Sequence, residues 1–282
     1  MKFWKYHGIG NDFILLDGSS GGVSVDADLC RRLCDRHYGI GADGVLYVLP
    51  GEGADVSMRI INADGSEAEM CGNGIRCVAK HVFDNGIVKK QKFKIRTQAG
   101  DLGAGVRLKD GKVQSVEVNM GAPVLDGRKV PIDHDGKFVD SDLEVGGRVI
   151  RGSAVSMGNP HFVTFSEIDE EDVRRLGPII ESHPFFPRRT NVEFCRVEGG
   201  SIFIKVYERG ADWTLACGTG ACASTVAAAV NGLVPFGEAV DVRLPGGWIR
   251  ITVDKDLKRV LMEGPAELVF EGNIDTSSLE GS

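Results

Sequence analysis

Two cysteines stand where their thiols could carry out acid–base chemistry. Cys71 opens the stretch Cys-Gly-Asn-Gly, and Cys217 opens the stretch Cys-Gly-Thr-Gly. In both places a run of small and apolar residues follows the glycines. Glycines at such a position let a ligand approach the backbone closely. We therefore predict that each cysteine lies at the N-terminal end of a helix.

The N-terminus of a helix suits both an anion and a thiolate. Its first N–H groups have no partner within the helix, and the helix dipole adds roughly half a positive charge there. A carboxylate binds well at such a place, and a thiol there has a lowered pKa. Each segment could thus hold an anion or supply a nucleophile. The alternative is that the glycines serve tight packing and the cysteines are small buried hydrophobes.

The two cysteine segments belong to an internal repeat. They align without gaps at one offset, 217 − 71 = 146. The matched pairs are Gly72 with Gly218, Gly74 with Gly220, Arg59–Asn62 with Lys205–Glu208, and Asn85–Gly86 with Asn231–Gly232. A less regular echo joins Gly-Asn-Asp-Phe near the start to Gly-Asn-Pro-His-Phe at 158–162. We infer two copies of one domain, residues 1–121 and 122–264, with 265–282 returning to the first.

The pattern of apolar residues predicts how each copy folds. In the first helix Ile75, Val78, Ala79, Val82 and Phe83 form one stripe, whereas the second helix is small and apolar on all sides. Asn-Gly ends both. Short alternating strands surround them in the sequence. We predict an α+β protein with two pseudo-symmetric domains, each a curled, barrel-like β-sheet around a central helix, and an active site in the cleft between them.

Two thiols on opposite sides of one α-carbon would invert its configuration without pyridoxal phosphate. One thiolate takes the α-hydrogen, and the opposite thiol returns a proton. The paired helix ends would stabilise the enolate-like charge that forms on the carboxylate. We therefore expect no cofactor and no metal.

Composition limits the partners. The chain has 282 residues and a net charge of −7, which argues against nucleic acid. We find no apolar stretch typical of a signal peptide or a membrane span. Seven cysteines without regular spacing read as reduced thiols, which favours the cytoplasm.

The sequence resembles the diaminopimelate epimerase family. The matching stretches are FWKYHGIGNDF, RHYGIGADGVL, RIINADGSEAEMCGNGIRC, SMGNPHFV, FPRRTNVEF, YERGADWTLACGTGACAS and GPAELVFEG. The resemblance implies interconversion of LL- and meso-2,6-diaminopimelate, a step of lysine and peptidoglycan precursor biosynthesis. It also implies a homodimer, to which Phe270 would contribute.

Site residues follow from the matching positions. The resemblance makes Cys71 the proton donor and Cys217 the acceptor in one direction, and places His161 and Glu208 among the catalytic residues. It assigns the reacting carboxylate to Gly72, Asn73, Gly218 and Thr219, and substrate contacts to Asn11, Asn62, Asn159, Asn191 and Arg209. A guanidinium and amides suit the distal carboxylate, and Glu208 suits the distal ammonium. Such a paired polar site would reject simple amino acids.

Each of these assignments has an ordinary structural alternative. The asparagines are also ordinary turn residues, His161 could be structural, and Glu208 with Arg209 could form a surface ion pair. The sequence also departs from the family at Gly44, where glutamine is frequent, and at Asp212-Trp213, where Gly-Glu is usual. Either departure could alter the site.

We predict that the remaining cysteines are buried in the hydrophobic core. Cys30, Cys34 and His37 lie at i, i+4 and i+7 of an expected helix, which could be a metal face, but no fourth ligand is evident and packing is favoured. Cys77, Cys195 and Cys222 also read as core.

Three other functions stay open at this point. One is a proline racemase-like or other cofactor-independent racemase. Another is a carboxylate-binding protein without activity. The third is a redox or metal protein that uses Cys71 and Cys217 as a pair. We expect a disulfide between these two cysteines to abolish activity.

Overall fold

The structure is a computed structural model that describes residues 1–279, and the chain forms two compact units. Unit 1 contains Met1–Asn119 and the segment that begins at Glu263, and unit 2 contains Met120–Met262. Both crossings lie within two residues of the divisions expected after residues 121 and 264. The chain therefore leaves unit 1 once and returns to it once.

Unit 1 is built on a curled sheet whose order is β18–β1–β2–β3–β4–β6–β7–β8, with β5 beside β4. Its elements are β1 (Lys2–Gly8), β2 (Asn11–Asp17), α1 (Ala27–Cys34), β3 (Gly44–Pro50), β4 (Val56–Asn62), β5 (Glu67–Ala68), α2 (Gly72–Asp84), β6 (Lys92–Thr97), β7 (Gly100–Lys109), β8 (Lys112–Asn119), β18 (Glu267–Asn273) and η1 (Thr276–Leu279). The pairs β2–β3 and β4–β6 are parallel. A parallel pair needs a crossover, and α1 and α2 lie in these crossovers.

Unit 2 repeats this order as β9–β10–β11–β12–β13–β15–β16, with β14 beside β13. Its elements are β9 (Ser141–Val145), β10 (Arg148–Ser156), β11 (Pro160–Thr164), α3 (Glu170–Glu181), β12 (Asn191–Glu198), β13 (Ser201–Glu208), β14 (Asp212–Thr214), α4 (Gly218–Val230), β15 (Ala239–Leu244) and β16 (Gly247–Val253). Strand β17 (Val260–Gly264) carries the chain back to unit 1. The parallel pairs are β11–β12 and β13–β15, with α3 and α4 in their crossovers.

The register of the strands follows the sequence repeat. Helices α2 and α4 begin and end 146 positions apart. Val56 pairs with Ile95 in unit 1, and Ile202 pairs with Val242 in unit 2, so that the first partners are 146 positions apart and the second partners 147. The fold class predicted from the repeat is therefore confirmed: each unit has a curled sheet and a helix that the sheet surrounds.

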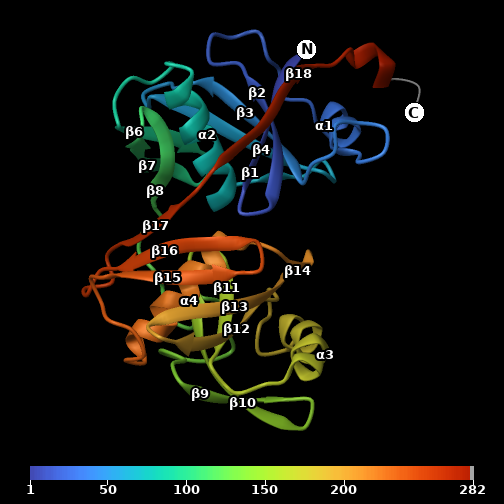
Figure 1. Cartoon of the computed structure of the whole chain (residues 1–282). Helices are drawn as coiled ribbons and strands as arrows, with labels where there is room; N and C mark the ends of the chain where they lie inside the picture. Colours follow the sequence, from blue (N-terminus) through green and yellow to red (C-terminus); the bar gives the residue numbers. More distant parts are fainter. Residues whose placement is uncertain (280–282) are drawn as a thin grey trace. The chain divides into compact units, whose positions relative to one another are not determined.

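Helices α2 and α4 lie among the strands of their own units, whereas α1 and α3 pack on the other face (Figure 1). Helix α4 is apolar and enclosed, as its composition predicts. Helix α2 differs from the prediction, because every residue from Gly72 to Val82 is buried and not one stripe alone. Its polar side chains have partners, such as Asp17 for His81 and the Val113 carbonyl for Lys80. A polar group can be enclosed when it is hydrogen-bonded in this way.

Candidate active site

Each cysteine caps the helix that follows it. The Cys71 sulfur accepts a hydrogen bond from Gly74 N at 3.5 Å, and the Cys217 sulfur accepts one from Gly220 N at 3.3 Å. Both cysteines have extended backbones, as N-cap residues do. The predicted position of each thiol at a helix N-terminus is thus confirmed.

The third residue of each helix is a glycine packed closely against a neighbouring side chain. A Cβ on Gly74 would lie 2.9 Å from the Leu46 side chain, and one on Gly220 would lie 2.8 Å from Glu193 Oε1. Close packing behind the cysteine therefore accounts for these two glycines. The side chain that packs against this glycine is the apolar Leu46 in unit 1 and the ionisable Glu193 in unit 2.

In unit 1 the thiol lies beside an asparagine. The Cys71 sulfur donates to Asn11 Oδ1 at 3.7 Å, and Asn73 Nδ2 donates to the same oxygen at 3.2 Å. The buried Arg76 holds Asn73 in turn, since its Nη2 donates to Asn73 Oδ1 at 2.8 Å. The structure thus brings together Asn11, Cys71 and Asn73 of the predicted set.

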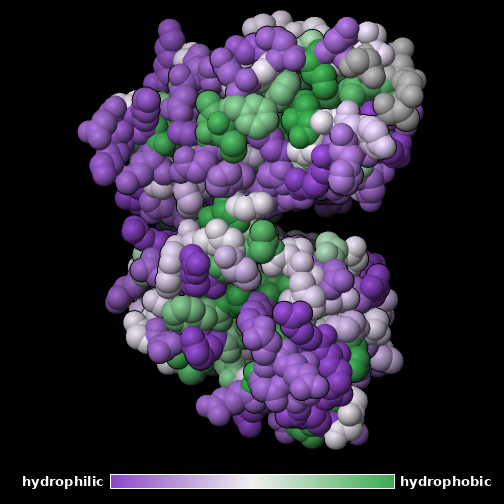
Figure 2. All heavy atoms as spheres, turned by 45° about the vertical axis from the view of Figure 1, so that its right-hand side comes forward, coloured by the Kyte–Doolittle hydropathy of each residue, from purple (hydrophilic) through white to green (hydrophobic). Residues whose placement is uncertain are grey.

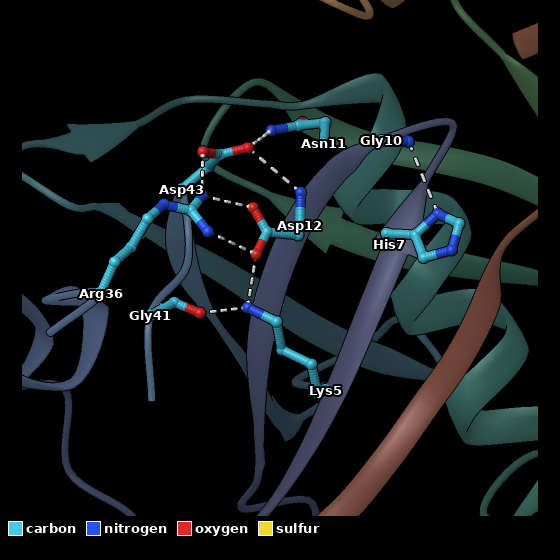
Figure 3. Close-up of polar contacts among 8 residues, drawn as sticks. All are labelled: Lys5, His7, Gly10, Asn11, Asp12, Arg36, Gly41 and Asp43. Carbon is cyan, nitrogen blue, oxygen red and sulfur yellow. Dashed lines mark hydrogen bonds and ion pairs between the residues drawn. The ribbon is translucent and has the colours of Figure 1, made fainter. Parts of the chain in front are cut away.

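An acidic pair orients Asn11 (Figure 3). Asn11 Nδ2 donates to Asp43 Oδ2 at 2.7 Å, so that its Oδ1 is left to face Cys71. Arg36 Nη2 bridges Asp43 and Asp12, at 2.9 and 2.7 Å. Lys5 completes the network from β1 by donating to Asp12 and to the Gly41 carbonyl. Sequence analysis missed Asp43, because nothing in its spacing distinguishes it from a turn residue.

In unit 2 a chain of polar side chains leads to the thiol. The Cys217 sulfur lies 3.5 Å from Thr219 Oγ1, which accepts from Asn159 Nδ2 at 3.3 Å. Asn159 Oδ1 lies 3.0 Å from His161 Nε2, and His161 Nδ1 lies 2.7 Å from Glu193 Oε1. His161 and Glu193 are fully buried. Cys217, Thr219, Asn159 and His161 are therefore brought together as one group.

The ionisation of Cys217 differs from the expectation. Burial raises the pKa of the Cys217 thiol well above its ordinary value, and the nearby Glu208 and Glu193 raise it further. The hydrogen bonds from Thr219 and Gly220 lower the pKa only in part. A helix N-terminus favours the thiolate, but here exclusion of water and two carboxyl groups outweigh it. In the structure as it stands, the surroundings of Cys217 favour the protonated thiol.

Glu193 is a second residue that sequence analysis missed. It lies in the matching stretch FPRRTNVEF, where it appears as one polar residue in a buried strand. A carboxyl group in such a strand was the available signal, because ionisable side chains are rarely fully buried without a partner.

Of the residues assigned to the distal end of a substrate, Asn191 and Arg209 meet. Asn191 Oδ1 accepts from Arg209 N at 2.9 Å, and Asn191 Nδ2 donates to the Pro160 carbonyl at 2.9 Å. Asn191 is therefore bonded to backbone, while the Arg209 side chain is exposed. Glu208 accepts a hydrogen bond from the Thr214 hydroxyl.

Asn62 lies at the end of β4, where its amide donates to Ser66 Oγ at 3.0 Å. The next residue, Ala63, donates its N–H to the Asp43 carbonyl, which places this turn beside the Asn11 network. The turn chemistry weighed for Asn62 is therefore present in the structure.

The structure shows what surrounds each departure from the family pattern. A Cβ on Gly44 would lie 2.8 Å from the Ile61 carbonyl oxygen, so that a side chain there requires a backbone shift. Asp212 has a positive φ of 64°, and the Trp213 ring packs on Tyr207 at 5.3 Å. Trp213 thus belongs to the apolar cluster under α3 and not to the group around Cys217.

The other cysteines are buried, as expected. Cys30 and Cys34 pack in the cluster under α1, and Cys77, Cys195 and Cys222 are buried as well. Cys30, Cys34 and His37 do not form a metal-binding face of one helix, because α1 ends at Cys34 and His37 is exposed in the following turn. Within residues 1–279, no group of three or more His, Cys, Asp or Glu could hold a metal ion. In the same residues, no helix is both long and apolar enough to cross a membrane.

Solved structures show which class of fold this is. A hydroxyproline epimerase from Agrobacterium vitis superposes with a TM-score of 0.69 at 17% identity, covering 97% of this chain and 90% of that one. Methylitaconate-delta-isomerase superposes with a TM-score of 0.67 at 15% identity, covering 100% and 98%. The chain therefore has the two-unit fold of this class of epimerases and isomerases.

Sequence comparison identifies the family within that class. The family model described as diaminopimelate epimerase matches residues 3–125 and 153–269. The diaminopimelate epimerase of Pelotomaculum thermopropionicum is 48% identical over 277 residues, which cover 96% of this chain and 98% of that protein. That of Desulfitobacterium hafniense is 48% identical over 278 residues, covering 96% and 97%. The chain belongs to the diaminopimelate epimerase family.

Proposed function

We propose that this chain interconverts LL- and meso-2,6-diaminopimelate by a two-thiol mechanism, in lysine and peptidoglycan precursor biosynthesis. The observation that carries the proposal is the pair of cysteine-capped helices, one in each unit, at matched positions of the repeat. The family to which the chain belongs supports the substrate. The enzyme is an isomerase that needs no pyridoxal phosphate.

The proton balance needs one thiolate and one thiol. In one direction, the Cys217 thiolate removes the α-proton, and the electron pair of the broken C–H bond moves into the carboxylate as an enolate. The Cys71 thiol then gives its proton to the opposite face of the carbon. The step ends with Cys217 as thiol and Cys71 as thiolate, and the reverse reaction exchanges these roles.

The helix ends would stabilise the charge that forms. The first N–H groups of a helix point out of its N-terminus, so Gly72, Asn73, Gly218 and Thr219 are suited to bind the reacting carboxylate. Such donors stabilise an enolate more than the starting acid because more charge lies on the oxygens.

The distal amino-acid end needs the opposite charges. The exposed Arg209 guanidinium is suited to its carboxylate, and Asn191 fixes the backbone from which Arg209 projects. Asn11, Asn62 and Asn159 add amide groups. Glu208 is suited to an ammonium group, and a cation there would offset the charge that raises the pKa of Cys217. Substrate binding would therefore favour the Cys217 thiolate.

We infer that the enzyme works in the cytoplasm, because a reducing compartment keeps both thiols able to carry protons. We also infer that it works as a homodimer, joined through the exposed apolar residues of β18.

The first experiment follows the α-proton by NMR. We expect reduced protein in deuterated water to exchange the α-proton of LL-diaminopimelate while the meso isomer appears. Replacing either thiol, by Cys71→Ser or Cys217→Ser, should slow epimerisation by at least about a hundredfold, the scale of general acid–base catalysis. Proline serves as the substrate control, and its exchange would favour the racemase alternative. A folded, reduced protein that binds diaminopimelate without exchange would be a binding protein and not an epimerase.

A further inference from the structure

The two units differ in what lies directly behind their cysteines. Phe13 pairs with Gly44 across the parallel strands of unit 1, and His161 pairs with Asn191 across the matching strands of unit 2. Two residues further along the second strand stand Leu46 and Glu193, each packed against the third residue of its helix. The apolar pair Phe13–Leu46 of unit 1 is thus matched by the ionisable pair His161–Glu193 of unit 2.

The hydrogen bonds of unit 2 can all point towards the Cys217 sulfur. Asn159 gives its Nδ2–H to Thr219 Oγ1, so the Thr219 hydroxyl is left to donate its own proton to the sulfur. Asn159 Oδ1 then accepts from His161 Nε2–H. With a proton on Nε2, the remaining nitrogen of a neutral imidazole accepts, and its partner is Glu193 Oε1.

Glu193 is suited to be the donor that starts this chain. It is fully buried, and its second oxygen, Oε2, has no hydrogen-bond partner among the described residues. An ionised carboxylate enclosed with one bare oxygen is costly, whereas a neutral carboxyl group costs much less. Burial raises the pKa of Glu193 accordingly. A protonated Glu193 donates to His161 Nδ1 and so keeps the imidazole proton on Nε2. In this neutral form it also lacks the negative charge by which its carboxylate would raise the pKa of Cys217.

The hydrogen-bond partners of Cys71 in unit 1 have the opposite effect on their thiol. Cys71 donates to Asn11 Oδ1, an interaction that stabilises the thiol and not the thiolate. The position that matches Thr219 is Asn73, which carries no hydroxyl group and donates to Asn11. The unit 1 partners thus favour a proton on the sulfur, whereas the unit 2 chain offers a proton to it.

We propose that Glu193 is a positioning residue for the reaction at Cys217, because it sets the direction of the His161–Asn159–Thr219 hydrogen bonds and so turns the Thr219 hydroxyl towards the thiolate. This proposal rests on the proposed function in giving Cys217 the role of base. Each donor in the chain strengthens the next, which offsets part of the cost of a thiolate in a buried site. The two units therefore differ at the two positions behind each cysteine. These positions are apolar in unit 1 and ionisable in unit 2.

The test measures the two thiols separately in the unliganded enzyme. Iodoacetamide alkylation is followed between about pH 7 and pH 10, with Cys71 and Cys217 read from their own peptides. The main variant, His161→Phe with Glu193→Leu, copies the apolar pair of unit 1. Replacing both partners of a buried pair by apolar groups is close to neutral for stability, so we expect it to fold.

We expect this double variant to slow alkylation of Cys217 near pH 8 by about ten- to a hundredfold, the scale of one hydrogen bond to an ionised group. Cys71 is the internal control, and its alkylation should stay unchanged. In the epimerase assay kcat should fall by a similar factor while KM changes little. Thr219→Val should reproduce the loss at Cys217, and Thr219→Ser, which keeps the hydroxyl group, should not.

Glu193→Gln is the conservative variant. Its amide N–H can donate to His161 Nδ1, so we expect alkylation of Cys217 within about threefold of the wild type. Unchanged Cys217 alkylation in the folded double variant, or an equal change at Cys71, would overturn the proposal. Should the wild type fail to epimerise diaminopimelate, the proposed function falls, but the alkylation profiles still decide the role of Glu193.

Discussion

At the residue scale, the thiols of Cys71 and Cys217 have the same cap geometry and different hydrogen-bond partners. The Cys71 sulfur donates to the carbonyl oxygen of an amide, and the Cys217 sulfur lies beside a hydroxyl group. The amide oxygen faces Cys71 because Asp43 holds the other end of Asn11. The proton preference of each sulfur therefore depends on residues that do not touch it.

Asp43→Ala tests this dependence in unit 1. Without Asp43, Asn11 can turn its Nδ2 towards Cys71, and we expect kcat to fall by about tenfold, the scale of one hydrogen bond. The melting temperature should change little, because Asp43 and its partner Arg36 are exposed. Asp135→Ala, which removes an exposed ion pair with Arg128, is the matched control. If both variants keep full kcat, Asp43 does not orient Asn11.

At the element scale, β18 is the strand that returns to unit 1 and pairs with β1. It exposes three apolar side chains in succession, Leu268, Val269 and Phe270, at 45%, 55% and 47%. Figure 2 shows a patch of hydrophobic side chains among hydrophilic ones on the face of unit 1 that it displays. A run of exposed apolar residues on a paired strand is typical of an interface between proteins.

We expect Phe270→Glu to convert a homodimer into a monomer, because a charge in the centre of an apolar interface loses its water without gaining a partner. Sedimentation at several protein concentrations measures the change. Val149→Glu places the same charge at an exposed apolar site of unit 2 and should leave the dimer intact. A wild-type protein that sediments as a monomer at all concentrations would contradict the proposal.

At the scale of the whole molecule, the proposed two-thiol reaction requires both sulfurs to reach one carbon. Cys71 belongs to unit 1 and Cys217 to unit 2, and the chain crosses between the units twice. Two-thiol epimerisation therefore requires the units to bring the sulfurs near each other when the substrate is bound.

We expect mild oxidation to join Cys71 to Cys217 and abolish activity, because a disulfide consumes both acid and base. Peptide mapping should show this disulfide, and reductant should restore activity. Cys71→Ser is the control that cannot form it. The buried Cys30 and Cys34 should stay reduced. Full activity in the cross-linked form would exclude the two-thiol mechanism.

The sequence by itself determined the repeat, the fold class and the two helix starts. A fixed offset of 146, glycines after each cysteine and Asn-Gly at each helix end are local signals, and local signals survive in a single chain. The enclosure of α4 was equally readable from its composition. The enclosure of α2 was not, because Arg76, Lys80 and His81 look like a solvated face until their partners are known.

Only the tertiary structure decided what surrounds each sulfur. Asp43 and Glu193 lie 28 and 24 positions from the cysteine that they influence, and strand pairing brings them near it. The pKa of Cys217 depends on burial and on carboxyl groups from two other strands, so a rule about helix ends alone gave the wrong direction. Chain neighbours fix a helix start, but the ionisation of a buried thiol is fixed by charges and hydrogen bonds that folding brings together.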